Sequence, residues 1–222
     1  MKVGIGEARD LHANTPPNWY FESIKVDFFQ RIWHRARFNN VSKVIEPVSG
    51  SVLDIGCADG TFSKVILDKS RADKLIGIDV LKTSVDWANR HCLPAGRRGR
   101  MKFSVGDAHS LKFSKNTFDA VFMMEVLEHV ADPKLVLKEV RRILKKGGYG
   151  VFLVPSDSFL FKIIWYFWLH FYPRGWVWEH THIQTYRKNF LTKICKQAGF
   201  KVEVDKKFNL GMLHLIKVRK YK

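Results

Sequence analysis

Cysteine is scarce in this 222-residue sequence. The three cysteines, Cys57, Cys92 and Cys195, have no CxxC spacing and cannot all pair with one another. This composition argues against a disulfide-stapled secreted domain and against a structural zinc site, and it favours a reducing, cytoplasmic location. Residues 1–18 lack the apolar segment of a signal peptide, so we expect a loose polar tail there.

Acidic residues are also few, 21 against 38 lysines and arginines, which gives a net charge of +17. A field of this sign attracts nucleic acid, anionic lipid headgroups or phosphorylated substrates. A solvated basic surface is the simpler alternative. The basic residues are scattered and are not interleaved with aromatic residues as in nucleic-acid-binding modules. The charge therefore leaves open a nucleic-acid partner or a peripheral contact with an anionic membrane.

No apolar run reaches the ~20 residues that cross a bilayer. The most apolar stretch is 158–178, whose core from Ile163 to Pro173 has no charged residue. We expect an aromatic-rich insertion at 156–183. Three interpretations remain: core beneath a cap, a wall for an apolar or aromatic acceptor, or a segment at a membrane interface, where Trp, Tyr and cations gather.

Strand and helix patterns alternate along the rest of the chain, which predicts a parallel sheet between helices. We expect a helix over 20–45, and two final strands with no helix between them should form an antiparallel hairpin. The predicted fold is α/β: a Rossmann-like three-layer sandwich with a seven-stranded, mostly parallel sheet. Strands are expected at 51–55, 74–79, 101–105, 118–124, 149–155, 200–204 and 212–218, and further helices at 61–67, 83–90 and 134–144.

The segment VLDIGCADG, residues 52–60, reads as a strand, a glycine turn and the start of a helix. Gly56 permits a sharp turn, and Gly60 permits close approach of a ligand to the backbone at a helix N-terminus. The spacing G-x-A-x-G differs from the G-x-G-x-x-G of dinucleotide sites. An acidic residue here, Asp54 or Asp59, could meet a cationic group of a nucleoside cofactor.

Two more acidic residues follow predicted strands. Asp79, in LIGIDV, suits a pair of ribose hydroxyls, although it could instead cap the next helix. Asp107, in VGDAHSL, suits the exocyclic amine of adenine, with the Ala108 amide at a ring nitrogen; taken alone it could be an Asx turn.

These motifs, followed by FDAVFMMEVLEHV and LKKGGYGVFLVP, resemble class I methyltransferases over residues 52–155, particularly the ubiquinone-biosynthesis-type O-methyltransferases (methyltransferase type 11). The resemblance implies S-adenosylmethionine as cofactor, S-adenosylhomocysteine as product, and methyl transfer to a small apolar or aromatic acceptor, at oxygen. It also implies a tail and helical cap over 1–47 and a methyltransferase domain over 48–222.

The resemblance further implies individual roles. Met124 should pack on the adenosine, and an arginine of the N-terminal helix, Arg37 or else Arg35, should meet the cofactor carboxylate. Ala58 departs from the family, which commonly has glycine there. The predicted cofactor-binding residues are Arg37, Asp54, Gly56, Cys57, Ala58, Asp79, Val80, Asp107, Ala108, Met124 and Glu125.

Glu125, Glu128 and His129 form an E-x-x-E-H pattern, and in quinone-directed relatives these residue types are associated with a divalent ion. Two carboxylates and an imidazole could hold a metal. Helical spacing, however, does not aim all three side chains at one point. Glu125 could instead face the cofactor while Glu128 and His129 begin a helix, so we do not expect a metal.

A hydroxyl acceptor requires a general base, and the candidates are His129, His180 and His182. The last two could equally satisfy hydrogen bonds within a loop. Two competing functions remain. One is a nucleic-acid methyltransferase, against which the chain lacks the Asn/Asp-Pro-Pro-aromatic motif of amino methylases. The other is a non-catalytic S-adenosylmethionine-binding subunit.

Overall fold

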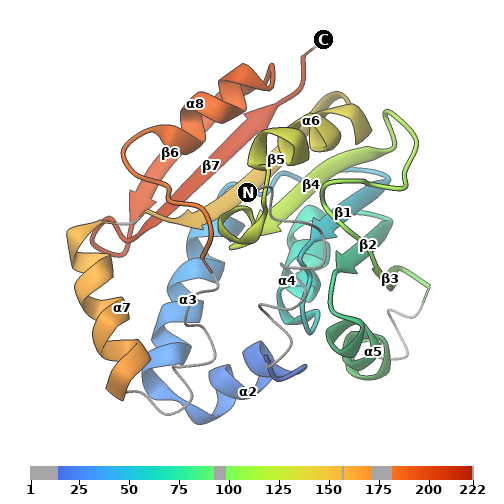
Figure 1. The fold of residues 1–222 in the computed structure, drawn as a ribbon. Helices are drawn as coiled ribbons and strands as arrows, with labels where there is room; N and C mark the ends of the chain where they lie inside the picture. Colours follow the sequence, from blue (N-terminus) through green and yellow to red (C-terminus); the bar gives the residue numbers. More distant parts are fainter. Residues whose placement is uncertain (1–14, 93–98, 157, 172–181, 222) are drawn as a thin grey trace.

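The computed structural model describes residues 15–92, 99–156, 158–171 and 182–221 (Figure 1). Seven strands form one sheet in the order β3-β2-β1-β4-β5-β7-β6. The first five strands run parallel, and β7 lies antiparallel between β5 and β6. The predicted seven-stranded sheet with a C-terminal hairpin is confirmed. The strands are β1 (Ser51–Ile55), β2 (Lys74–Asp79), β3 (Met101–Val105), β4 (Phe118–Met124), β5 (Leu144–Pro155), β6 (Lys201–Phe208) and β7 (Leu213–Arg219).

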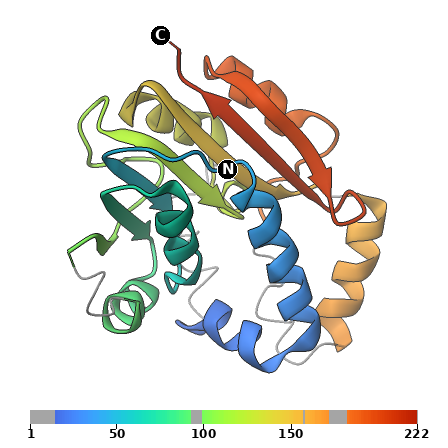
Figure 2. The same ribbon diagram turned by 180° about the vertical axis from the view of Figure 1, so that it is seen from behind.

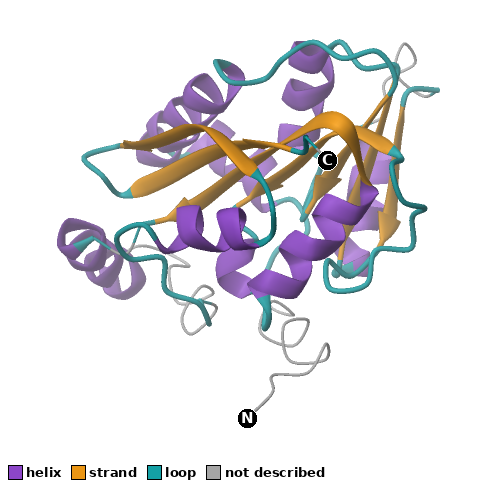
Figure 3. Ribbon diagram, turned by 90° about the horizontal axis from the view of Figure 1, so that it is seen from above, coloured by secondary structure: helices purple, strands orange, loops and turns teal. Residues whose placement is uncertain are grey.

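Helices cover both faces of the sheet (Figures 2 and 3). Successive side chains of a strand point to opposite faces, so each strand contributes to two cores. Leu53 and Val121 pack in the core that contains α6 and α8, whereas Val52 and Phe122 pack in the core that contains α3, α4 and α5. The helices are α2 (Trp19–Val26), α3 (Phe28–Ser42), α4 (Thr61–Ser70), α5 (Lys82–His91), the 3₁₀ turn η1 (Leu127–His129), α6 (Pro133–Ile143), α7 (Phe159–Phe171) and α8 (Phe190–Gln197).

The single helix predicted over 20–45 is wrong, because the helix is interrupted at Asp27. The Asp27 backbone is extended (φ −113°, ψ 123°), and its carboxylate accepts a hydrogen bond of 2.7 Å from the Gln30 amide. Aspartate at such a position satisfies an amide at the start of a new helix, which offers the chain an alternative to continuing the old one. The chain therefore turns between α2 and α3.

Two strands are longer than predicted. β5 begins at Leu144, directly after α6, and the first hairpin strand extends to Phe208. The turn of the hairpin holds Asn209, Leu210 and Gly211, all with positive φ. α7 lies within the aromatic insertion and has 13 residues. In the described part of the chain, no helix combines the length and apolar character needed to cross a membrane.

Tyr149 ties the end of the N-terminal segment to the sheet. Its ring is buried, and its hydroxyl donates to the carbonyl of Glu46 at 2.7 Å and accepts from the Glu46 amide at 3.1 Å. The Glu46 carboxylate in turn forms ion pairs with Lys217 and Arg219 of β7. The segment between α3 and β1 is thus fixed to two central strands.

We expect Tyr149→Phe to lower the free energy of unfolding by about 0.5–1.5 kcal/mol, because it removes the two part-buried hydrogen bonds between the Tyr149 hydroxyl and the Glu46 backbone. Urea titration followed by circular dichroism measures the change. Tyr166→Phe, at an exposed position of α7, is the matched control and should leave stability unchanged. Equal unfolding free energies for Tyr149→Phe and the unsubstituted chain would contradict the anchoring role.

Candidate functional site

The carboxyl ends of β1, β2, β3 and β4 surround a cavity of about 120 Å³. In parallel α/β sheets such a crevice opens where the strand order reverses, which here lies between β1 and β4. Its wall includes these residues from the strand ends and the loops that follow them: Ile55, Gly56, Ala58, Asp59, Asp79, Val80, Leu81, Ser84, Gly106, Asp107, Ala108, His109, Met124, Glu125, Val126, His129 and Val130.

The glycine turn after β1 closes one side of this cavity. Gly56 has φ +72°, and a Cβ atom there would clash with the Val126 side chain. Gly60, the N-cap of α4, has φ +74°, and a Cβ atom there would come within 2.9 Å of the Phe103 ring. Ala58 adopts φ +44°, the left-handed region that favours glycine, which gives a physical reason for the glycine common in relatives.

Asp79 holds the turn from the neighbouring strand. Its carboxylate accepts hydrogen bonds of 2.9 Å from the amides of Ala58 and Leu81. Burial raises the pKa of this carboxyl, while these amides oppose the rise. The helix-capping alternative is not what the structure shows, because α5 begins at Lys82 with Leu81 as its N-cap.

The acidic residues of the turn itself are engaged in supporting it. Asp54 is only 2% exposed and accepts a bond of 2.6 Å from the Ser63 hydroxyl, and burial raises the pKa of its carboxyl to about 7. Asp59 accepts from the amides of Thr61 and Phe21, which joins α2 to the turn. The predicted residues Asp54 and Cys57 are absent from the cavity wall in the described structure, whereas Asp59 forms part of it.

Asp107, after β3, lies on the wall of the cavity. Its Oδ1 accepts from the His109 amide at 2.9 Å and lies 2.8 Å from the His109 Nδ1. Its Oδ2 is buried and has no hydrogen-bond partner among the described residues. Because a buried carboxylate oxygen is costly without a donor, this atom marks a place for a ligand N–H.

Arg37, which was also predicted to bind the cofactor, lines the larger cavity described below and is absent from the wall of this one in the described structure. Its guanidinium forms an ion pair of 3.0 Å with Glu125, contacts His34 Nδ1 at 3.0 Å and lies over the Tyr20 ring. Burial and the neighbouring cation lower the pKa of His34 to about 2, so this imidazole is neutral and accepts from Arg37. Arg35, the alternative, is exposed.

The start of the described chain covers the cavity, contrary to the expectation of a loose tail up to residue 18. Thr15, Pro16, Pro17, Trp19 and Tyr20 all belong to its wall. Apart from the Pro-Pro pair followed by aromatics, the sequence gives no signal for this contact.

A second cavity of about 700 Å³ lies between α3 and α7, which Figures 1 and 2 show side by side. Its wall is mainly apolar and aromatic. It shares Trp19, Tyr20, Glu125 and His129 with the first cavity, so the two adjoin at these residues. Its other lining residues come from α3 (Phe29, Gln30, Ile32, Trp33, His34, Ala36, Arg37), α7 (Phe161, Ile164, Trp165, Phe167, Trp168, Phe171), the hairpin turn and its edge (Asn209, Leu210, Met212), and Glu128, Pro155 and His182.

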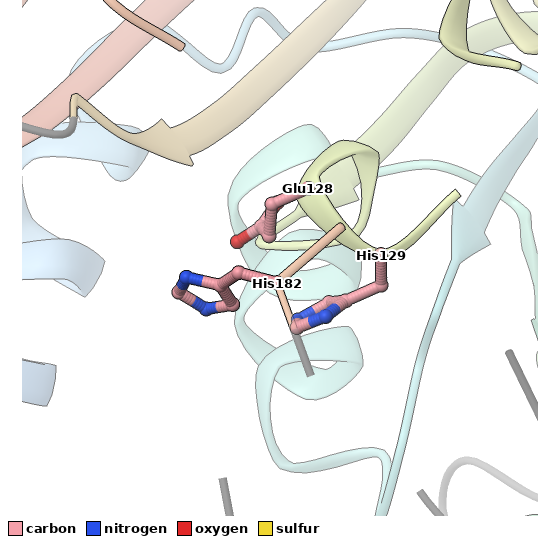
Figure 4. A group of neighbouring side chains, drawn as sticks. All are labelled: Glu128, His129 and His182. Atoms are coloured by element: carbon pink, nitrogen blue, oxygen red, sulfur yellow. The ribbon is translucent and has the colours of Figure 1, made fainter. Parts of the chain in front are cut away.

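Two of the predicted catalytic histidines meet at this junction (Figure 4). The ring centroids of His129 and His182 lie 5.0 Å apart, and His182 stacks on Trp165 of α7. Glu128 lies beside them, and ligand atoms of the three residues fall within 4.8 Å of one another. Glu125 of the E-x-x-E-H pattern faces Arg37 instead. His180 lies outside the described residues.

Comparison with known proteins agrees with this geometry. A family model described as a methyltransferase domain matches residues 25–204. A ubiquinone biosynthesis O-methyltransferase of Aliivibrio fischeri is 30% identical over 174 residues, covering 75% of this chain and 72% of that protein.

Two solved structures share the fold. An S-adenosylmethionine-dependent methyltransferase from Mesorhizobium loti aligns with a TM-score of 0.67 at 17% identity, over 83% of this chain and 98% of its own. A geranyl diphosphate methyltransferase in complex with S-adenosylmethionine aligns with a TM-score of 0.69 at 14% identity, over 95% and 93% of the two chains. The chain therefore belongs to the methyltransferase domain family, and it is an S-adenosylmethionine-dependent methyltransferase of the Rossmann-like type.

Proposed function

We propose that this enzyme transfers the methyl group to a hydroxyl of an apolar, phenol-type acceptor held between α3 and α7. The observation that carries the proposal is the apolar cavity of about 700 Å³, which adjoins the cofactor cavity. Its volume lies within the range of small-molecule sites, about 300–1,000 Å³. The similarity to O-methyltransferases supports oxygen as the methylated atom.

The contacts around the smaller cavity support a pose for the cofactor. Asp107 Oδ2 would accept the adenine amine, and the Ala108 amide would donate to a ring nitrogen. Asp79 would hold the ribose beside Val80, and Met124 would pack on the adenosine. The turn at Gly56 would line the methionine part. Arg37, whose buried Nε has no partner in the described part of the chain, would meet the cofactor carboxylate near Glu125.

Asp107→Ala should weaken S-adenosylhomocysteine binding about 10- to 100-fold, because a hydrogen bond to a charged group contributes roughly 1.5–3 kcal/mol. Isothermal titration calorimetry measures the dissociation constant. Asp86→Ala on α5, where the carboxylate is exposed and paired with Lys82, is the control and should bind normally. If Asp107→Ala binds S-adenosylhomocysteine with a dissociation constant within threefold of that of the unsubstituted chain, Asp107 does not bind the adenine.

Methyl transfer is a displacement in which the acceptor oxygen attacks the methyl carbon as the carbon–sulfur bond breaks. The sulfonium is already a good leaving group, so the protein mainly aligns the reactants and excludes water. A hydroxyl acceptor must also lose its proton. His129 lies on the wall of both cavities and His182 beside it, so we place activation of the hydroxyl at these imidazoles. The imidazoles can act by accepting the proton, or by binding a cation that lowers the pKa of the acceptor hydroxyl.

His129→Ala should lower kcat for methylation of 4-alkylcatechols about 10²-fold or more, the usual contribution of a group that assists proton transfer. S-adenosylhomocysteine affinity should change less than threefold. Transfer of labelled methyl from the cofactor measures the rate, with His91→Ala, on α5 and exposed, as control. If RNA is methylated but no catechol is, whatever the length of its alkyl chain, the acceptor is a nucleic acid. If neither is methylated, the result favours a non-catalytic subunit.

The side chains at the opening of the proposed acceptor cavity favour an acceptor that is taken from a membrane surface. Phe29 of α3 and Phe167 of α7 are 77% and 56% exposed, and both line the cavity. Neither helix contains an acidic residue, while Arg31, Arg35 and Lys162 are exposed on them. Apolar side chains flanked by cations favour the interface of an anionic membrane. We therefore place an acceptor with a lipid-like tail at such a surface.

The double variant Phe29→Glu/Phe167→Glu should abolish flotation with vesicles of phosphatidylcholine and phosphatidylserine, because it adds anionic charge to the apolar opening. The control is Tyr221→Glu, which replaces an exposed aromatic next to the C-terminus; Figure 1 shows the C-terminus at the opposite end of the molecule from α7. This variant should still float. If the unsubstituted chain does not float with anionic or with neutral vesicles, the membrane proposal fails.

A further inference from the structure

Glu128, His129 and His182 are brought together by the backbone. The carbonyl oxygen of Glu128 accepts hydrogen bonds of 2.9 Å from the amides of both Ile183 and Gln184. These bonds attach the residues after His182 directly to the turn η1, which carries Glu128 and His129. Two further bonds fix the same segment, from the Gln184 side chain to the Ala131 carbonyl and from the Tyr186 hydroxyl to the Leu127 carbonyl.

The arrangement of the three side chains suits a cation. Their ligand atoms all lie within 4.8 Å of one another (Figure 4). Metal–ligand bonds of about 2.0–2.2 Å place the ligands of a tetrahedral site roughly 3.3 Å apart. Small side-chain rotations would therefore close these three onto one ion. Glu128 is fully buried, and a buried carboxylate is strongly stabilised by a neighbouring cation.

We infer that Glu128, His129 and His182 form a site for one divalent transition-metal ion, with Zn²⁺ the best fit. Two imidazole nitrogens with one carboxylate oxygen are a donor set that suits Zn²⁺, whereas Mg²⁺ prefers oxygen ligands. The ligand set differs from the E-x-x-E-H pattern, because Glu125 is paired with Arg37 at 3.0 Å and His182 takes the third place. This reverses the expectation of no metal.

The consequence for catalysis rests on the proposed function. All three proposed ligands line the acceptor cavity, so an ion held by them would lie next to the acceptor. A Zn²⁺ ion there would lower the pKa of an oxygen bound to it. The acceptor hydroxyl would lose its proton to solvent, and its oxygen would bond to the methyl carbon while the electron pair of the breaking carbon–sulfur bond stays with S-adenosylhomocysteine. In this arrangement His129 and His182 are ligands and take no proton.

Titration of the chelator-treated full chain with ZnCl₂ tests the site by calorimetry. We expect one tight equivalent, at least tenfold weaker binding for Glu128→Gln and for His182→Ala, and binding within threefold of the unsubstituted chain for Glu125→Gln and for the control His91→Ala. MgCl₂ should give no tight binding. Addition of CoCl₂ to the unsubstituted chain should give the intense visible absorption of a tetrahedral site, which provides a second readout independent of any variant.

Three results would overturn the inference: no tight Zn²⁺ and no such Co²⁺ spectrum, unchanged Zn²⁺ affinity in His182→Ala, or loss of Zn²⁺ in Glu125→Gln with retention in His182→Ala. Calorimetry with S-adenosylhomocysteine on the same samples separates this failure from failure of the proposed function. If the chain binds the cofactor but not zinc, only the metal-site inference is wrong. If it binds zinc but not the cofactor, the proposed function is wrong.

Discussion

The parallel pairing of β1 with both β2 and β4 is the constraint on which the rest of the site depends. In this register Ile55 lies beside Ile78 on one side and Met123 on the other. Three strand ends therefore emerge at one edge, and the loops that follow them surround the same space. The carboxylate of Asp79 secures the arrangement, because it binds amides that follow two different strands. Without that bridge the left-handed turn at Ala58 would lose its partner in the adjacent loop.

Much of this edge could be predicted from the sequence. Short apolar runs define buried parallel strands, and the strands at 51–55, 74–79, 101–105 and 118–124 have the predicted bounds. Acidic residues at the ends of such runs were expected to serve one cofactor, and Asp79 and Asp107 both line the same cavity. Sequence position could not say which face a side chain takes. Asp54 closely precedes the turn, but its strand directs it beneath the turn toward Ser63.

The contacts that could not be predicted join segments far apart in the chain. No periodicity indicates that the amides after His182 bind the carbonyl of Glu128, or that Arg37 reaches Glu125. The break at Asp27 has a local cause, yet aspartate also occurs within helices, so the residue alone did not reveal it. The cavity between α3 and α7 depends on how two helices that lie far apart in the sequence pack together, and burial patterns within each helix do not determine that packing.

The two halves of the site are built from different parts of the fold, and this difference bears on how such an enzyme changes through evolution. The cofactor side consists of strand ends, where a substitution disturbs the central sheet. The proposed acceptor side consists largely of α3, α7 and the hairpin turn, which lie outside the parallel strands. Cavity-lining side chains there that are exposed, such as Phe29 and Phe167, can be exchanged with little effect on the central sheet. In such an architecture the acceptor can change while the donor site stays the same, and we expect such changes to fall on the exposed cavity-lining side chains of these two helices.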